Sequence, residues 1–526
     1  MDLDRLTKPE RAVWEAFPQG ELVSLGGARG AARNVRAEVI SRLLLGPAPA
    51  ETGKIAAVRL DGARVTGRLD LGHSVITGPL RLRDCQFDTA IDLSGAHTRD
   101  VELDGSQLVG LLGRLAEVDG DLSTVACKIS GQLVLTGAHI TGAFQMQRAL
   151  LDNPGKVALL ANRLVIDDDL LGQEATVNGE MRLAGAHVSG IIGLDGAHIR
   201  GGGRRAVNAF NLTVGLSMWA RSGFTAEGEV ALSDARIGQN LEFQGAVFRN
   251  PGGDALVARG IQVGGYLSFA DGFSAEGAMR LSRAKVGAEL YFCGGRFVNP
   301  GDDAIRCRNA DARLLALDQG MTADGIADFR FSRFVIIRDD QSCWPRQLRL
   351  SGLSYEALDP QISALNRVEW LRRDIDGYLP QNYETLASMY RARGDDSSAR
   401  TVLLARERQH REQLPWYGQA WSWLQEMTVG YGYRPLRAGA WLAAFLGIGT
   451  LVFGLHHPPP INGVPHPTFN ALIYSLDLLV PLVNLGLRSA YNPQGVERWL
   501  AFLLMAVGWI FVTTIAAGIA RVLRRQ

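Results

Sequence analysis

Residues 131–142 read Gly-Gln-Leu-Val-Leu-Thr-Gly-Ala-His-Ile-Thr-Gly, and variants of this stretch return four times further along the chain. The opening glycine recurs at steps of 48 or 49 residues, and apolar residues follow it at fixed distances. The recurring residues are Gly131, Gly179, Gly228, Gly277 and Gly325. Self-similarity at a fixed period indicates one supersecondary unit stacked on copies of itself. The sequence therefore predicts a solenoid.

Within each unit, apolar residues alternate with polar ones, as in the Arg-Leu-Asp-Leu of residues 68–71, and glycines end the runs. Half-coils of 10 or 11 residues make a coil of about 21 residues, so two coils and a short insert fill each unit. Asn-Pro-Gly, a turn-forming set, marks the insert at 153–155, 250–252 and 299–301. We therefore expect a mainly β fold, a parallel β-helix, with the right-handed form as the default.

The periodicity changes along the chain and divides it into five expected segments. They are a helical N-terminal cap over 1–50, the β-helix over 51–345, a helical region over 346–414, an interfacial amphipathic segment over 415–436 and a membrane domain over 437–526. The cap starts with Thr7, Pro9 and Glu10, the pattern of a capping box. Residues 381–412 match one tetratricopeptide-like helical hairpin, whose apolar face needs a neighbour to cover it.

Two stretches near the C-terminus are apolar enough to span a bilayer, about 438–455 and 499–520. Arginines precede the first and follow the second, so the positive-inside rule places both chain ends in the cytosol. The polar start of the chain carries no signal-peptide core, and the five cysteines form no CxxC pair. Lysine supplies only five of the 55 basic residues, an arginine bias typical of G+C-rich bacterial genes. We therefore expect a multi-pass protein of a bacterial cytoplasmic membrane, with the β-helix and both termini in the cytosol.

Aromatic residues flank these two stretches, and we expect them to anchor the chain at the membrane interface. The anchors are Trp416, Trp423, Tyr431, Tyr433, Trp441 and Trp499. The first two share one face of an amphipathic helical segment. The lipid bilayer is thus the first partner that the sequence predicts.

Between the two stretches lies an apolar run over 469–487, interrupted by Asp477 and Pro481. It is too broken for an ordinary span and too apolar for a free loop. Two interpretations stay open, a re-entrant half-helix that lines a pore and an external interfacial helix. In the first, Asp477, Pro481 and Asn484 are pore or membrane-depth positions, and the chain assembles as a homo-oligomer.

The residues supply no signature of catalysis, because no GxGxxG follows a strand and no Walker loop or GxSxG elbow is present. Four histidines follow Gly-Ala pairs at the repeat turns: His97, His139, His187 and His198. Later units hold Arg236 and Lys285 in this slot, which favours an outward residue over a metal ligand. The net charge of +1 argues against nucleic acid as a partner. We expect no cofactor and no metal, and we lean against an enzyme.

Three features carry a resemblance to known proteins. They are the Val-Arg-Ala-Glu-Val-Ile of 35–40 before the Leu-Leu-Leu-Gly of 43–46, the Gly-Ala-x-Val/Ile-x-Gly coils, and the Tyr-Gly-Tyr-Arg-Pro of 431–435. Over nearly its whole length the chain resembles a family of bacterial membrane proteins, common in actinobacteria, that join pentapeptide-like β-helical coils to a C-terminal membrane region. Members often carry the label "membrane-associated oxidoreductase", so the resemblance implies that activity. Strict five-residue periodicity is absent from this chain.

Three functions follow from these patterns. The favoured one is a membrane-anchored cytosolic β-solenoid scaffold or interaction protein without catalytic activity, with protein partners on the solenoid face. The alternative is an oligomeric pore-loop-like channel subunit, whose β-helix acts as a sensor or assembly domain. The third is the membrane-associated oxidoreductase that the resemblance implies, for which the residues offer no flavin, nicotinamide or haem site.

Overall fold

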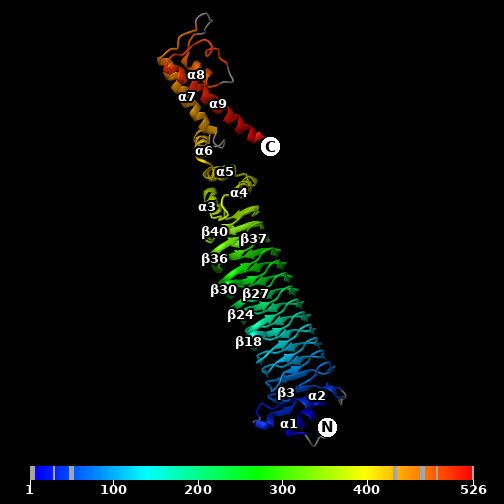
Figure 1. Cartoon of the computed structure of the whole chain (residues 1–526). Coiled ribbons are helices and arrows are strands. Elements are labelled where there is room, and N and C mark those ends of the chain that lie inside the picture. The colour runs from blue at the N-terminus through cyan, green and yellow to red at the C-terminus, as the bar shows by residue number, and fades with distance from the viewer. Residues whose placement is uncertain are drawn as a thin grey trace. The chain divides into compact units, whose positions relative to one another are not determined.

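The structure is a computed structural model, and it describes residues 6–27, 30–46, 53–429, 435–461, 468–480 and 484–523. The chain forms two compact units, one of residues 1–362 and 369–385 and the other of residues 363–368 and 386–526. The first unit is built on a parallel β-solenoid of about 13 turns, and the second is helical (Figure 1). The predicted β-helix is thereby confirmed, while its hand stays a prediction.

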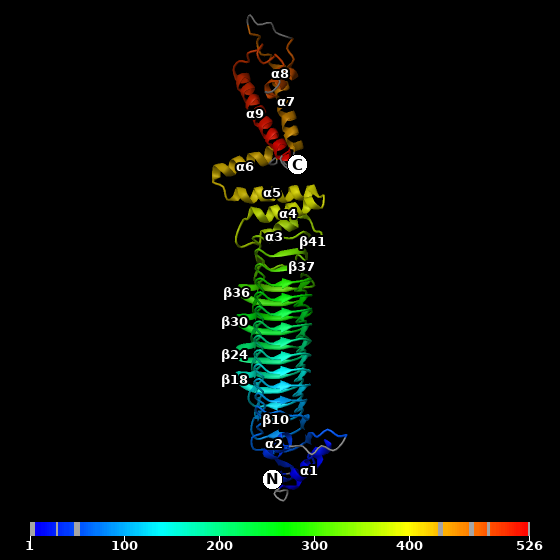
Figure 2. The ribbon, with the colours of Figure 1, turned by 90° about the vertical axis from the view of Figure 1, so that its right-hand side faces the viewer.

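Strands stack coil upon coil into two parallel sheets, which hold 24 and 17 strands among the described residues (Figure 2). The pairing advances by one coil at each step, as where β10 (Gln107–Leu108) meets β14 (Lys128–Ile129) and Gln107 lies opposite Lys128. Residues opposite each other are thus about 21 positions apart, the coil length that the alternation predicts.

The N-terminal segment caps the solenoid with helices and also contributes its first strands. Helix α1 (Lys8–Ala16) begins with the predicted capping box, and α2 (Ala37–Leu45) follows. Two strands lie in the segment that we predicted as helical, β1 (Leu22–Ser24) and β2 (Asn34–Arg36). They pair with β3 (Val58–Asp61) and β4 (Arg64–Thr66). The cap is therefore helical only in part, because these strands cover the edge of the next coil with hydrogen bonds.

Each insert widens one strand into an 11-residue element that contains a loop. These elements are β18 (Leu150–Leu160), β24 (His198–Asn208), β30 (Val247–Val257) and β36 (Arg296–Arg306). Their neighbours have seven residues each: β21 (Thr176–Arg182), β27 (Thr225–Ala231), β33 (Ser274–Arg280) and β38 (Thr322–Asp328). The register between β30 and β33 jumps from Arg249↔Glu276 to Asp254↔Ala278, so the intervening residues leave the ladder. In this loop the Asn250 Nδ2 donates to the Asp254 carbonyl at 2.8 Å.

Three of the recurring glycines face these loops. Gly179, Gly277 and Gly325 have φ values of +130°, +117° and +136°. A Cβ on Gly277 would lie 2.5 Å from the Asn250 carbonyl oxygen, so only glycine fits against the loop. Gly131 has no such loop beside it, and there a Cβ would instead lie 2.3 Å from the Val109 carbonyl oxygen.

Aromatic side chains fill the solenoid core over its middle coils. Phe243, Phe269 and Phe292 stack in a column, with 5.5 Å between successive ring centroids. Phe248 and Phe273 run beside them, 5.2 Å apart and edge to face. These rings are buried, and they form the continuous apolar interior that holds one coil on the next.

The solenoid continues past its predicted end at residue 345. Strand β40 (Gln347–Arg349) pairs with β38, and β41 (Ala357–Asp359) pairs with β39 (Arg333–Asp339). Trp344 and Pro345 interrupt the sequence pattern, but Trp344 packs into the core against Phe329. The region that we predicted as helical from 346 therefore begins with two more strands.

Helices follow the strands. They are α3 (Ala364–Leu371), α4 (Pro380–Ala392), α5 (Asp396–Glu412), α6 (Trp416–Val429), α7 (Pro435–Leu455), α8 (Ala471–Leu479) and α9 (Val496–Leu523). Helices α4 and α5 occupy the segment predicted as a helical hairpin, and α6 occupies the predicted amphipathic segment. Among the described residues, one helix is long and apolar enough to cross a membrane, α9 with Val496–Thr513. Helix α7 supplies a shorter apolar stretch, Gly439–Leu455.

Candidate functional site

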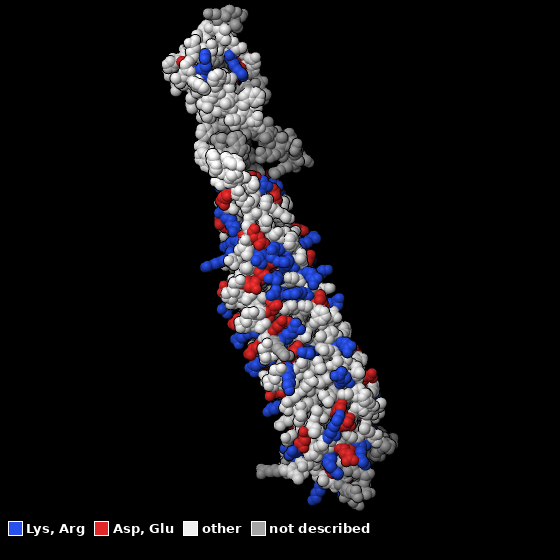
Figure 3. All heavy atoms as spheres, in the orientation of Figure 1, with Lys and Arg blue, Asp and Glu red and all other residues white. Residues whose placement is uncertain are grey.

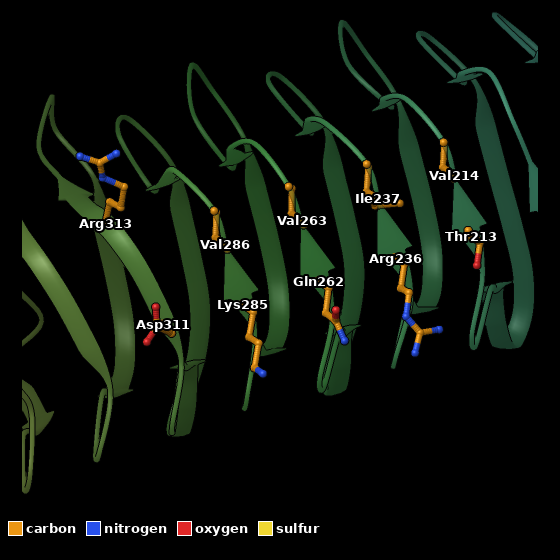
Figure 4. A pocket seen from close by; sticks show the side chains of 14 residues that line it. Thr213, Val214, Arg236, Ile237, Gln262, Val263, Lys285, Val286, Asp311 and Arg313 are labelled. Carbon is orange, nitrogen blue, oxygen red and sulfur yellow. The ribbon is translucent and has the colours of Figure 1, made fainter.

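A groove crosses the outer surface of the larger sheet and has a cavity volume of about 770 Å³ (Figure 4). It extends over β25 (Thr213–Val214), β28 (Arg236–Ile237), β31 (Gln262–Val263), β34 (Lys285–Val286) and β37 (Asp311–Leu317). Its floor consists of Gly215, Gly238, Gly264 and Gly287. We call it the glycine groove.

Each of these floor glycines lies against the backbone of the preceding coil. A Cβ on Gly238 would lie 1.9 Å from the Gly215 carbonyl oxygen, and a Cβ on Gly264 would lie 2.1 Å from the Gly238 carbonyl oxygen. Real side chains do not approach a backbone oxygen so closely. In earlier coils the same position holds Asp167 and Ser189, so the groove begins where glycine replaces them.

Side chains of successive strands form one wall of the groove. Thr213, Arg236, Gln262, Lys285 and Asp311 lie opposite one another in the parallel ladder. Adjacent strands lie about 4.8 Å apart, so these side chains form a closely spaced row. Figure 4 shows Arg236, Gln262 and Lys285 side by side, projecting in the same direction.

The two cations of this row, Arg236 and Lys285, are exposed, and no described residue forms an ion pair or a hydrogen bond with their side chains. In an earlier coil, His139 occupies the same slot and its Nε2 lies 2.9 Å from a carboxylate oxygen of Asp167. The equivalent of Asp167 beside Arg236 is Gly264, which has no side chain. Arg236 therefore lacks the carboxylate partner that His139 has.

A second polar cluster, on a neighbouring row of the same sheet, is satisfied internally. The Arg221 guanidinium lies 2.9 Å from both Asp195 and Glu242 and lies over the Trp219 ring, 4.8 Å from its centroid. The Tyr266 hydroxyl donates to Glu242 at 2.7 Å. Burial and this hydrogen bond raise the pKa of Tyr266 to about 12. Because these groups satisfy one another, the cluster stabilises the coils and leaves little for a ligand.

The cysteines are buried, and their thiols are poor nucleophiles. Burial raises the pKa of both Cys85 and Cys127 to about 12. A thiol with so high a pKa carries almost no thiolate near neutral pH. Within the described ranges, no three His, Cys, Asp or Glu side chains come together in a way that could hold a metal ion.

Of the predicted membrane-depth residues, Asp477 lies in α8 and is 2% exposed. Its two carboxylate oxygens accept the backbone N–H groups of Leu485 at 2.8 Å and Arg488 at 2.7 Å. Asn484 is exposed, and its side-chain oxygen accepts the Gly486 N–H at 3.0 Å. Pro481 lies outside the described residues. Asp477 therefore holds the chain segment that follows α8 in place. The sequence did not indicate these hydrogen bonds.

The predicted aromatic anchors divide into two groups. Trp416, Trp423 and Trp499 are 80%, 58% and 74% exposed. Trp441 is half-buried, and its Nε1 donates to the Met427 carbonyl at 3.3 Å. Tyr431 and Tyr433 lie outside the described residues. These three indoles, on α6 and α9, remain largely exposed, although Trp416 contacts Tyr417 and Trp499 contacts Phe502.

Helix α8 packs tightly between α7 and α9. Phe453, Tyr474 and Leu504 belong to one buried cluster that joins the three helices. A Cβ on Gly449 would lie 2.8 Å from the Ser475 Oγ, and a Cβ on Gly508 would lie 2.1 Å from the Leu479 carbonyl oxygen. Small residues at such positions allow helices to approach closely.

Sequence reasoning missed the glycine groove, although a signal was present. A glycine comes two residues after each of Thr213, Arg236, Gln262 and Lys285. These glycines read as ordinary turn residues, because the neighbours that they meet come from other coils. No family model, curated protein or solved structure matches the chain. The functional argument therefore depends on the groove and the helices themselves.

Proposed function

We propose that the protein is a membrane-tethered scaffold, whose cytosolic solenoid binds protein partners along the glycine groove. One observation carries the proposal. The groove presents two cations, Arg236 and Lys285, that have no ion-pair partner among the described residues, over a floor of glycines. The polar cluster on the same sheet, in contrast, is satisfied by its own ion pairs and hydrogen bonds. A rigid stack of coils suits such a role, because repeat proteins commonly bind along an extended surface.

The tether in this proposal consists of α7 and α9, both crossing the bilayer. Helix α9 supports it by its length, and α7 supports it by its apolar stretch and its packing with α8. On the face in Figure 3, charged side chains cover the solenoid and are sparse over the C-terminal helices. Helix α8 then enters the membrane from one side. A broken helix is tolerated at membrane depth only where protein buries it, and α8 is buried between the two spans. Both termini face the cytosol of a bacterial cell.

The channel alternative receives less support from the helices. It places Asp477 at membrane depth, where the side chain would face a pore. Asp477 instead directs both of its oxygens at backbone N–H groups of its own chain. We therefore favour the scaffold.

Two experiments on the full chain test this function. Washing membranes with alkaline carbonate should leave the protein in the pellet, and release into the supernatant would contradict the tether. A photo-cross-linking residue at Gln262, inside the groove, should form adducts with a partner protein in cells. The same residue at exposed Gln107, on the other sheet, should form none. Equal adducts at both positions, or none at Gln262, would contradict a binding role for the groove.

A further inference from the structure

We propose that the glycine groove takes an acidic peptide in the extended polyproline II conformation, with a carboxylate at about every third residue. This deepens the scaffold function and rests on it, since it names the chemistry of the segment bound there. A polyproline II segment is already extended before it binds, so little conformational entropy is lost when it is held in one conformation.

The spacing of the basic residues supports this ligand. One slot of the ladder holds a basic residue in every second coil: His139, His187, Arg236, Lys285 and Arg333. Two coils separate neighbours in this series by about 9.6 Å. A polyproline II helix repeats every three residues, or about 9.3 Å. A bound β-strand presents side chains on one face at intervals of about 6.7 Å, and this spacing does not match basic residues about 9.6 Å apart.

The charges in the groove favour an anion. Its lining contains the cations of Arg236, Lys285 and Arg313 and the single carboxylate of Asp311. Asp167 pairs with His139 in an earlier coil. Its equivalent beside Arg236 is Gly264, and its equivalent beside Lys285 is Arg313. Ligand carboxylates can therefore take the place that Asp167 holds beside His139.

The uncharged parts of the groove suit a peptide backbone. The glycine floor lets a main chain approach the coils closely. Between the two cations, the Gln262 amide has donors for the carbonyl groups of a polyproline II chain, which makes no internal hydrogen bonds. No aromatic ring lines the groove in the described chain, so nucleobases have nothing on which to stack.

The test measures fluorescence anisotropy of a labelled peptide of five Pro-Pro-Glu repeats, titrated with the full chain in detergent. We expect saturable binding that weakens with salt, and no binding of the matched Pro-Pro-Gln peptide. The double variant Arg236→Gln/Lys285→Gln should weaken binding by about tenfold, as expected for the loss of two exposed ion pairs. The control Arg259→Gln/Arg283→Gln removes the same charge at two exposed positions outside the groove and should leave binding unchanged.

Three results would overturn the inference. They are equal binding of the glutamate and glutamine peptides, equal loss in both double variants, and binding of a linear polyuronate or a single-stranded oligonucleotide in place of the peptide. Failure here is distinguishable from failure of the scaffold function. In that case cross-linking from Gln262 to a protein persists although the acidic peptide does not bind.

Discussion

The Gly215 carbonyl oxygen occupies the space that a side chain on Gly238 would need. A methyl group at this position would lie 1.9 Å from that oxygen, so the backbone of one coil would have to move. Flexible side chains cannot relieve such a contact, because both partners belong to the stacked backbone. The identity of this residue is therefore fixed by packing between coils, before any binding is considered.

Gly238→Ala should lower the free energy of unfolding of the solenoid by about 1–3 kcal/mol, the cost of overpacking a well-packed site. Circular dichroism during chemical denaturation measures it. The control is Gly27→Ala, because a Cβ there meets no atom within 4 Å and the backbone φ is ordinary. Equal stability of the two variants would show that the coils are not stacked as described.

Glu10 is a buried acid that joins the first helix to the first strands. Its side chain is 1% exposed and pairs with Arg36, whose Nε lies 2.7 Å away. It also accepts the Thr7 N–H at 2.9 Å and the Arg36 N–H at 3.1 Å. The hydrogen bond from the Arg36 side chain, with these others, lowers the pKa of Glu10 to about 2.

The cap should accordingly loosen in acid. A carboxylate with a lowered folded-state pKa stabilises the fold fully above its unfolded value of about 4.5, and this stability is lost as the pH falls towards 2. Hydrogen exchange of the 8–16 amides, corrected for intrinsic rates, should rise across this window. Glu10→Gln should raise exchange at neutral pH, at a cost of about 1–3 kcal/mol, and remove the pH dependence. A pH dependence that survives this substitution would contradict the assignment.

At the scale of elements, α8 depends on the carboxylate at its C-terminal end. Asp477→Asn keeps the shape but replaces one acceptor by a donor, which then faces a backbone N–H group. The amides of Leu485 and Arg488 should exchange faster, since leaving a buried donor unpaired costs about 1–3 kcal/mol. Asn484→Ala, at an exposed site with one local hydrogen bond, is the control and should change exchange far less.

The same variant separates the two interpretations of this segment. If Asp477 orders the chain after α8, liposomes that contain the Asn variant should show the same ion flux as those with the original chain. A change in flux that scales with the charge at this position would favour the pore interpretation and contradict ours.

The sequence predicted the elements whose signal is local. Alternation and turn glycines reveal a coil within a few residues, and Asn-Pro-Gly marks the inserts because Asn, Pro and Gly favour turns. Strands β1, β2, β40 and β41 escaped prediction because each is defined by its partner in another coil and not by the repeated local pattern. The glycine groove escaped for a similar reason. Its shape depends on contacts such as Gly238 with Gly215, which are 23 residues apart in the chain.

At the scale of the whole molecule, we propose a solenoid in the cytosol and helices that enter a bilayer. The described cysteines are all buried, so a water-soluble maleimide should not label them in the folded chain. A single added cysteine therefore reports the side of the membrane on which its position lies. Two exposed glutamines offer matched positions, Gln107 in the solenoid and Gln494 just before α9.

The most direct test of the tethered solenoid labels Gln107→Cys and Gln494→Cys in intact bacterial cells with a membrane-impermeant maleimide. We expect Gln494→Cys to react from outside, whereas Gln107→Cys should react only after the cytoplasmic membrane is permeabilised. Reaction of both variants in intact cells, or of neither until permeabilisation, would contradict a hairpin of two spans with the solenoid in the cytosol.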